Sequence, residues 1–105
     1  MPGGMLEEAV VREALREVID PELGHNIVDL GLLYGVLVRD RAIEITMTLT
    51  TPGCPAQDYI LSGVQECCRR LPGAEDVRIR LVWEPPWSPQ KMSPGARAQS
   101  GISDD

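Results

Sequence analysis

Apolar residues recur at helical spacing along the first part of the chain. They fall at positions 6, 10, 14 and 18 and at 11, 15 and 19, which form two adjacent stripes of a helix. Charged residues fill the opposite face, and two early glutamates suit the positive end of a helix dipole. The pattern predicts a helix over residues 6–19 that ends at Asp20-Pro21, because a residue before proline avoids the α region.

A stricter alternation, with a period of two, predicts three β-strands. Leu33–Arg39 is expected to form the first, and Asp40-Arg41 a tight turn into the second. Val77–Trp83 alternates in the same way and is expected to form the third. The second strand has two distinct faces, with Ile43, Ile45, Met47 and Leu49 on the apolar side and Glu44, Thr46, Thr48 and Thr50 on the polar side.

A second amphipathic helix is expected between the last two strands, over residues 55–71. Its apolar positions are 56, 60, 64, 67 and 71, and Pro72-Gly73 stops it. The order helix-strand-strand-helix-strand predicts a small α/β domain of the two-layer α+β kind, a three-stranded sheet with both helices on one face. We assign this domain to residues 5–90. Residues 91–105 are rich in Pro, Ser and Gly, and we expect a C-terminal flap or a flexible tail there.

Composition and charge narrow the functional classes. The 105 residues are 43% apolar and 25% charged, which is typical of one globular domain. No apolar run approaches the roughly 20 residues of a membrane span, and no secretory signal is visible, so we expect a cytoplasmic protein that does not bind membranes. A net charge of -6 disfavours nucleic acid as a partner. The three cysteines make no closed disulfide framework and are expected to be reduced.

Cys54 is the first candidate for chemistry. It lies directly before Pro55, and proline favours the first position of a helix, so we expect Cys54 near the N-cap of the second helix. The N–H groups and dipole of a helix start favour a thiolate, and Thr50 and Thr51 offer hydroxyl groups beside it. Such a thiolate serves as a nucleophile or as a soft-metal ligand. The alternative is a small buried residue at a helix start.

The other cysteines and the single histidine have plainer interpretations. Cys67 and Cys68 follow the apolar positions of the second helix and lack the C-x2-C spacing of a zinc or redox site, so we expect both to pack in the core. His25 is either a base for Cys54 in a nucleophilic arrangement or an ordinary loop residue.

Acidic and aromatic residues supply further candidates. Asp20, Glu22 and Asp29 crowd the loop after the first helix. The first two would suit a metal, whereas Asp20 also suits the capping of backbone N–H groups in an Asp-Pro turn. Trp87 follows a rigid Pro-Pro pair, and either covers a site, faces a partner or fills a gap over the sheet edge.

Three blocks of the sequence are more specific together than any is alone: DPELGHNIVDLGLLYGV, MTLTTPGCP and EPPWSPQKMSPGAR. In this order and spacing, over roughly residues 6–97, they resemble the MIP18 family, also known as the DUF59 or PaaD/SufT-like domain. The resemblance implies a fold of the iron–sulfur cluster assembly domain type, in agreement with the predicted element order. It also implies an accessory role in assembling iron–sulfur clusters or delivering them to client proteins.

The resemblance also implies which residues bind iron or a cluster. The family's motif cysteine falls on Cys54, the expected metal ligand, and its acidic motif on Asp20 and Glu22. The threonine of the cysteine turn falls on Thr51, and the aromatic residue of the last block on Trp87.

Two departures from the family concern the C-terminal part. After Met92 the family usually continues as a short charged helix, which Ser93-Pro94-Gly95 and Gln99-Ser100 are expected to weaken here. The chain also lacks the cysteine-rich extension of PaaD-type members, so it resembles a stand-alone, SufT-like domain.

The number of thiolates limits the mechanism. A stable iron–sulfur cluster generally needs about four thiolates, and this chain offers one that is expected to be exposed. We therefore expect Cys54 to be a transient ligand during hand-over, or one of two Cys54 thiolates across a homodimer, and purified protein to carry little or no metal.

The resulting prediction is a non-enzymatic maturation factor whose partners are the iron–sulfur assembly machinery and client apoproteins. Two alternatives stay open. One is a thiol-dependent enzyme with Cys54 as nucleophile and His25 or a carboxylate as base. The other is a non-catalytic interaction adaptor in which Cys54 only packs at a helix start.

Overall fold

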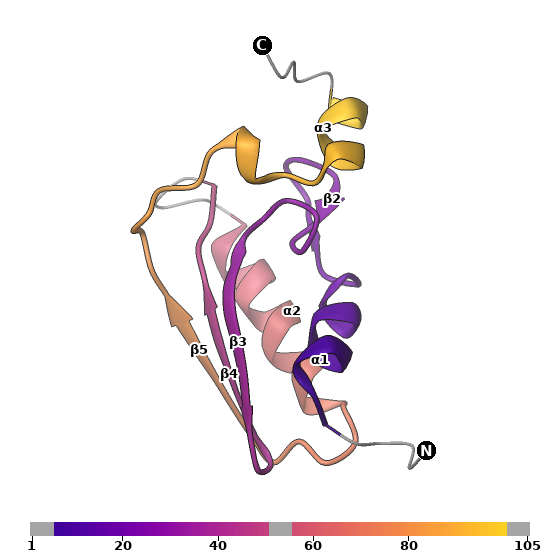
Figure 1. Cartoon of the computed structure of the whole chain (residues 1–105), viewed down its shortest axis with the longest axis vertical. Coiled ribbons are helices and arrows are strands. Elements are labelled where there is room, and N and C mark those ends of the chain that lie inside the picture. Colours follow the sequence, from indigo (N-terminus) through magenta and orange to yellow (C-terminus); the bar gives the residue numbers. More distant parts are fainter. Residues whose placement is uncertain (1–5, 51–55, 101–105) are drawn as a thin grey trace.

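The structure is a computed structural model that describes residues 6–50 and 56–100 of the chain. A three-stranded sheet in the order β3-β4-β5 carries helices α1 and α2 on one face (Figure 1). This confirms the predicted two-layer fold and the predicted order of its main elements. Their bounds are Glu8–Leu15 for α1, Leu33–Arg39 for β3, Ala42–Met47 for β4, Gln57–Arg69 for α2 and Asp76–Leu81 for β5.

The two strand connections differ because the strand directions differ. β3 and β4 are antiparallel and joined by the predicted two-residue turn, in which Asp40 adopts a positive φ of 56°. Aspartate tolerates this left-handed conformation better than most residues. β4 and β5 are parallel, and a parallel pair needs a crossover, which α2 supplies.

The core lies between the sheet and the two helices. The predicted apolar face of β4 is fully buried at Ile43, Ile45 and Met47. Thr48, which the alternation placed on the polar face, is buried as well. Regular strand geometry ends at Met47, and the N–H of Thr48 donates to the carbonyl of Leu32 at 2.9 Å. The alternation of faces therefore does not extend to Thr48.

The first helix is shorter than the predicted 6–19. It ends at Leu15, and the chain turns so that Ile19–Asp20 forms a short strand, β1, paired antiparallel with β2, His25–Asn26. The N–H of Ile27 also donates to the carbonyl of Val18 at 3.0 Å. These backbone bonds to the following segment stop the helix before Pro21 is reached.

The chain after β5 crosses one end of the sheet (Figure 1). We call residues 85–96 the C-terminal strap. It contains a 3-10 turn, η1 (Pro89–Lys91), and the beginning of a short helix, α3 (Pro94–Ser100). The expected weakening of this last helix is not observed, because proline is well tolerated in a first helical turn and the Ser93 hydroxyl accepts a hydrogen bond from the N–H of Ala96. Met92 and Ala96 are buried in the core.

Candidate functional site

Asp20 is a buried carboxylate that organises the loop between β1 and β2. Its Oδ1 accepts hydrogen bonds from the N–H groups of Glu22, at 2.8 Å, and Leu23, at 3.3 Å, so the predicted capping of the Asp-Pro turn is confirmed. Its Oδ2 is also buried, yet it accepts no hydrogen bond within the described part of the chain. An unpaired polar atom in this position costs on the order of 1–3 kcal/mol.

Three further polar residues, His25, Glu22 and Asp29, lie on or beside the Asp20 loop. His25 is the direct cross-strand partner of Asp20 in the β1–β2 pair and is half-buried. Glu22 is exposed. Asp29, by contrast, has a structural role, because its carboxylate accepts from Asn26 Nδ2 at 2.9 Å while its N–H donates to Asn26 Oδ1 at 2.8 Å.

Cys54 and Thr51 lie in residues 51–55, outside the described residues. The chain is anchored in the core on both sides of that segment, by Leu49 after β4 and by Ala56 before α2. The N-cap of α2 is Ala56, so this helix begins two residues later than the position expected from Pro55. The side chain of Ala56 has no polar atom to cap the first N–H groups of the helix.

Trp87 holds the C-terminal strap to the body of the molecule. Its indole N–H donates to the carbonyl of Leu30 at 2.6 Å, and the ring is half-buried against the core. Two further bonds hold the same strap, from the Tyr34 hydroxyl to the carbonyl of Pro85 and from the N–H of Ser93 to the carbonyl of Asp29, both 2.6 Å long. The packing role considered for Trp87 is therefore what its described contacts support.

The two adjacent cysteines of α2 face different surroundings. Cys68 is fully buried, as expected, and desolvation raises the pKa of its thiol to about 12. Cys67 is half-buried, and its thiol donates to the carbonyl of Ala14 at 3.1 Å. Desolvation, and then the charge of Glu17, raise the pKa of Cys67. Both thiols are therefore poor nucleophiles at neutral pH.

The described residues, 6–50 and 56–100, include several His, Cys, Asp and Glu side chains. In these residues no group of three or more His, Cys, Asp or Glu side chains is placed to hold a metal ion.

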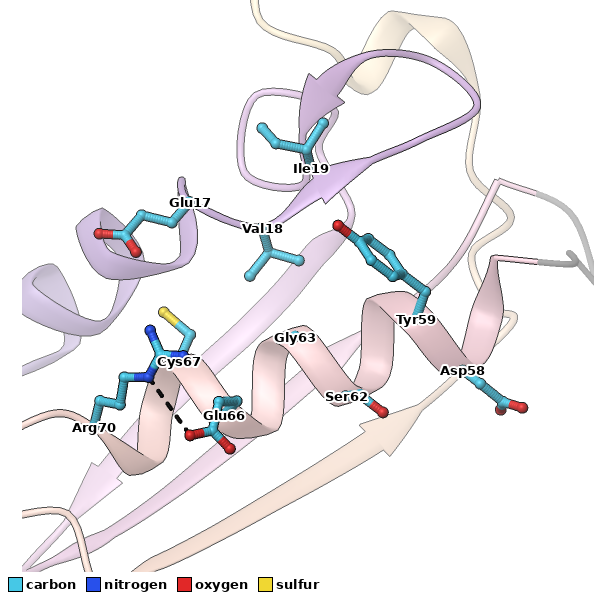
Figure 2. A pocket seen from close by; sticks show the side chains of 10 residues that line it. All are labelled: Glu17, Val18, Ile19, Asp58, Tyr59, Ser62, Gly63, Glu66, Cys67 and Arg70. Atoms are coloured by element: carbon cyan, nitrogen blue, oxygen red, sulfur yellow. Dashed lines mark ion pairs between the residues drawn. The ribbon is translucent and has the colours of Figure 1, made fainter.

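A groove of about 680 Å3 lies between α2 and the chain that follows α1 (Figure 2). Sequence reasoning missed it, because it depends on how residues 17–19 turn away from α1. Its lining combines carboxylates, apolar side chains and one arginine: Glu17, Val18, Ile19, Asp58, Tyr59, Ser62, Gly63, Glu66, Cys67 and Arg70.

Among residues 6–50 and 56–100, no helix has the length and apolar character needed to cross a membrane.

The sequence model of a family described as "Iron-sulfur cluster assembly protein" matches residues 8–81, from the start of α1 to the end of β5. The chain belongs to this family. The match confirms the family that the sequence blocks indicated, and it covers the first two of those blocks. It spans α1, α2 and all three strands of the main sheet.

Two curated members of the iron–sulfur cluster assembly family match this chain over almost their whole length. Fe-S protein maturation auxiliary factor YitW of Bacillus subtilis is 44% identical over 101 residues, covering 92% of this chain and 99% of YitW. Fe-S protein maturation auxiliary factor SufT of Staphylococcus aureus is 42% identical over 87 residues, covering 82% of this chain and 99% of SufT. Both proteins are named as maturation factors and not as enzymes.

A solved structure confirms the family fold. A domain of unknown function, DUF59, from Bacillus anthracis superposes with a TM-score of 0.86 at 40% identity, covering 91% of this chain and 92% of that domain. The predicted iron–sulfur cluster assembly type of fold is therefore confirmed.

Proposed function

We propose that this chain is an accessory factor in the maturation of iron–sulfur proteins, which helps to deliver iron or an iron–sulfur cluster to client apoproteins. The observation that carries this proposal is the match over 99% of the length of two relatives named Fe-S protein maturation auxiliary factors. Its partners are then the assembly machinery and the apoproteins that receive the cargo. The names of the relatives favour this function over a thiol-dependent enzyme.

In this proposal Cys54 is the transient ligand of the cargo. A single thiolate does not hold a cluster, which generally needs about four, so the remaining ligands come from a second copy, from the donor or from the client. Delivery is a ligand exchange: a client thiolate binds iron as the bond between iron and Cys54 breaks. No electron is transferred, and the proton of the incoming thiol passes to the released Cys54 thiolate or to water.

We assign Asp20 to the same function because its buried Oδ2 has no hydrogen-bond partner in the described residues. A folded protein retains such a costly atom most readily where the atom serves a ligand or a proton. Glu22 adds an exposed carboxylate on the same loop, and Thr51 adds a hydroxyl group to the cysteine segment. Trp87 contributes by fixing the C-terminal strap over the loop that contains Leu30.

The first test is complementation of a strain that lacks this gene. We expect wild type to restore the specific activity of an aconitase-type cluster enzyme and Cys54→Ser to fail at equal abundance. Cys67→Ser is the matched control, since a serine hydroxyl can keep the hydrogen bond to Ala14 and this thiol is not proposed as a ligand of the cargo. We expect it to complement fully.

A second pair of variants separates function from folding at Asp20. Asp20→Asn keeps an oxygen that can accept from the N–H groups of Glu22 and Leu23, so we expect its stability to stay within about 1 kcal/mol of wild type. Asp20→Ala loses both bonds and should cost about 1–3 kcal/mol in urea unfolding. Both variants should fail to complement. Full complementation by Asp20→Asn would contradict the proposed role of the Asp20 carboxylate.

The other outcomes select the alternatives. Complementation by Cys54→Ser would leave a maturation factor that needs no thiolate and would favour the adaptor. Cluster enzymes that stay fully active after deletion of the gene would contradict a general role in maturation, and would leave either a narrow set of clients or a thiol-dependent enzyme.

A further inference from the structure

The groove beside α2 has an apolar floor and an open apolar end. α2 approaches the preceding chain closely at Gly63, where an added Cβ would lie 3.2 Å from Cγ1 of Val18. Figure 2 shows Tyr59 rising from α2 toward the side of the groove formed by Val18 and Ile19. Tyr59 is 64% exposed and Ile19 40% exposed. Two large apolar side chains therefore border a hollow that the described part of the chain leaves unfilled.

Charge defines what this groove attracts. Three carboxylates line it, those of Glu17, Asp58 and Glu66, against one guanidinium, that of Arg70. Arg70 forms an ion pair with Glu66 at 3.5 Å, whereas Glu17 and Asp58 form no ion pair within the described residues. The groove thus presents two uncompensated negative charges beside exposed apolar surface. A cationic partner with an apolar side chain complements both features.

We propose that this groove, which we call the acidic groove, docks a positively charged segment of the client protein, with an aliphatic side chain of that segment seated between Ile19 and Tyr59. The inference rests on the proposed function only for the identity of the client. A volume of about 680 Å3 accommodates a few side chains rather than a whole domain.

Other occupants fit the groove less well. A second copy of this chain also carries a net charge of -6, so its approach is opposed by charge over the whole molecule. Nucleic acid is polyanionic and meets the unpaired Glu17 and Asp58. A neutral apolar segment would leave both carboxylates without a partner.

Photo-crosslinking in cells identifies the occupant. The full-length chain carries p-benzoylphenylalanine in place of Tyr59, and a control carries it in place of Leu37, which is 44% exposed. Leu37 follows the buried Val36 in β3 and so faces away from the helices. We expect crosslinks from position 59 alone to segments of iron–sulfur proteins in which Lys or Arg flank an aliphatic residue.

Three crosslinking results would overturn the proposal. They are a yield at position 59 no higher than at position 37, crosslinks to another copy of this chain, and crosslinks to acidic or uncharged segments. Segments of the expected charge in proteins that hold no cluster would support the docking chemistry and contradict the proposed function. The two ideas therefore fail separately.

Binding of a synthetic peptide then tests the residues. The probe is the crosslinked segment itself, made with a fluorescent label and titrated against folded protein. We expect Glu17→Lys to raise the Kd of the peptide by about tenfold at low salt. The effect should shrink as the salt concentration rises. Glu44→Lys, the same charge change on the sheet face away from the helices, should alter Kd less than about twofold. Equal losses from the two variants would show unspecific attraction and overturn the site.

Discussion

At the scale of single residues, Cys67 and Cys68 show how one position along a helix changes the chemistry of a thiol. Cys68 points into the core and is fully buried, whereas Cys67 borders the acidic groove and donates to the carbonyl of Ala14. The apolar spacing of α2 predicted burial for both cysteines. The burial of Cys67 also depends on where α1 ends, which this spacing does not indicate. The segment 17–19 turns away at that point and leaves Cys67 half-buried.

The buried Cys68 thiol makes stability depend on pH in the alkaline range. Its pKa is raised by burial from an ordinary 9.0 to about 12, so between these values the unfolded chain releases a proton that the folded chain retains. The stabilisation is fully present below about pH 9 and is lost as pH rises toward 12. Over this interval we expect the free energy of unfolding to fall by about 1.4 kcal/mol per pH unit.

Urea unfolding at several pH values between about 8 and 11 measures this slope, with Cys68→Ala as the comparison, because that variant lacks the titrating group. The other ionisable groups are common to both proteins, so the difference between the two curves reports Cys68 together with its interaction with Cys67. Parallel curves would show that Cys68 titrates normally in the folded chain.

At the scale of secondary structure, the sequence predicts the elements whose patterns are local. β3 has the predicted bounds, and α2 and β5 lie within two residues of theirs. The short β1–β2 pair was not predicted, because two-residue strands carry no periodicity and form through backbone bonds such as that from Ile27 to Val18. A C-terminal flap and a packing role for Trp87 were among the expectations, but the carbonyl groups of Leu30 and Asp29 that receive the strap have no sequence signal.

Gly24 and Gly31 have nearly the same backbone conformation but different surroundings. Substituting each one therefore distinguishes the cost of backbone strain from the cost of displacing the C-terminal strap. Gly24 and Gly31 have φ values of 75° and 77°, but an added Cβ meets open space at Gly24 and collides with the carbonyl oxygen of Lys91 at Gly31. The left-handed conformation alone costs an alanine about 1–2 kcal/mol. We expect Gly24→Ala to lose that amount, and Gly31→Ala to lose a further 1–3 kcal/mol or so as the strap is displaced.

Urea unfolding gives both losses, and tryptophan fluorescence of the folded variants reports the strap, because Trp87 lies on it. The emission maximum should shift to longer wavelength in Gly31→Ala and stay unchanged in Gly24→Ala. Equal losses with unchanged emission would mean that the strap accommodates the extra methyl group without moving.

At the scale of the whole molecule, the candidate site was predictable only as a set of residues. The sequence blocks indicate Cys54, Asp20 and Glu22 together. The structure adds that Asp20 is buried, with one oxygen that has no hydrogen-bond partner among the described residues. The acidic groove had no such signal. It arises where the chain after α1 passes α2, and its charge comes from Glu17 and Asp58, which are distant in sequence. A site formed by packing of two elements needs their placement to be known.

If docking and cargo transfer use separate sites, a variant that has lost only the cargo site should inhibit the wild-type protein. If the acidic groove binds clients and Cys54 handles the cargo, Cys54→Ser still docks clients but delivers nothing. Overproduced beside the wild-type protein, it should occupy clients unproductively and lower the specific activity of their cluster enzymes. Adding Glu17→Lys to Cys54→Ser should relieve this inhibition, because a weakened groove no longer competes for clients.

The matched control is Cys54→Ser with Glu44→Lys, which carries the same net charge as the relieved variant and leaves the groove intact. It should inhibit as strongly as Cys54→Ser, with all three proteins at equal abundance. Relief by both charge changes would trace the inhibition to net charge. Absence of inhibition by Cys54→Ser would mean that clients are held through the cargo and Cys54, and that the groove adds too little affinity to compete. Inhibition relieved by Glu17→Lys alone requires a docking surface that works without the thiolate, which is the role we propose for the acidic groove.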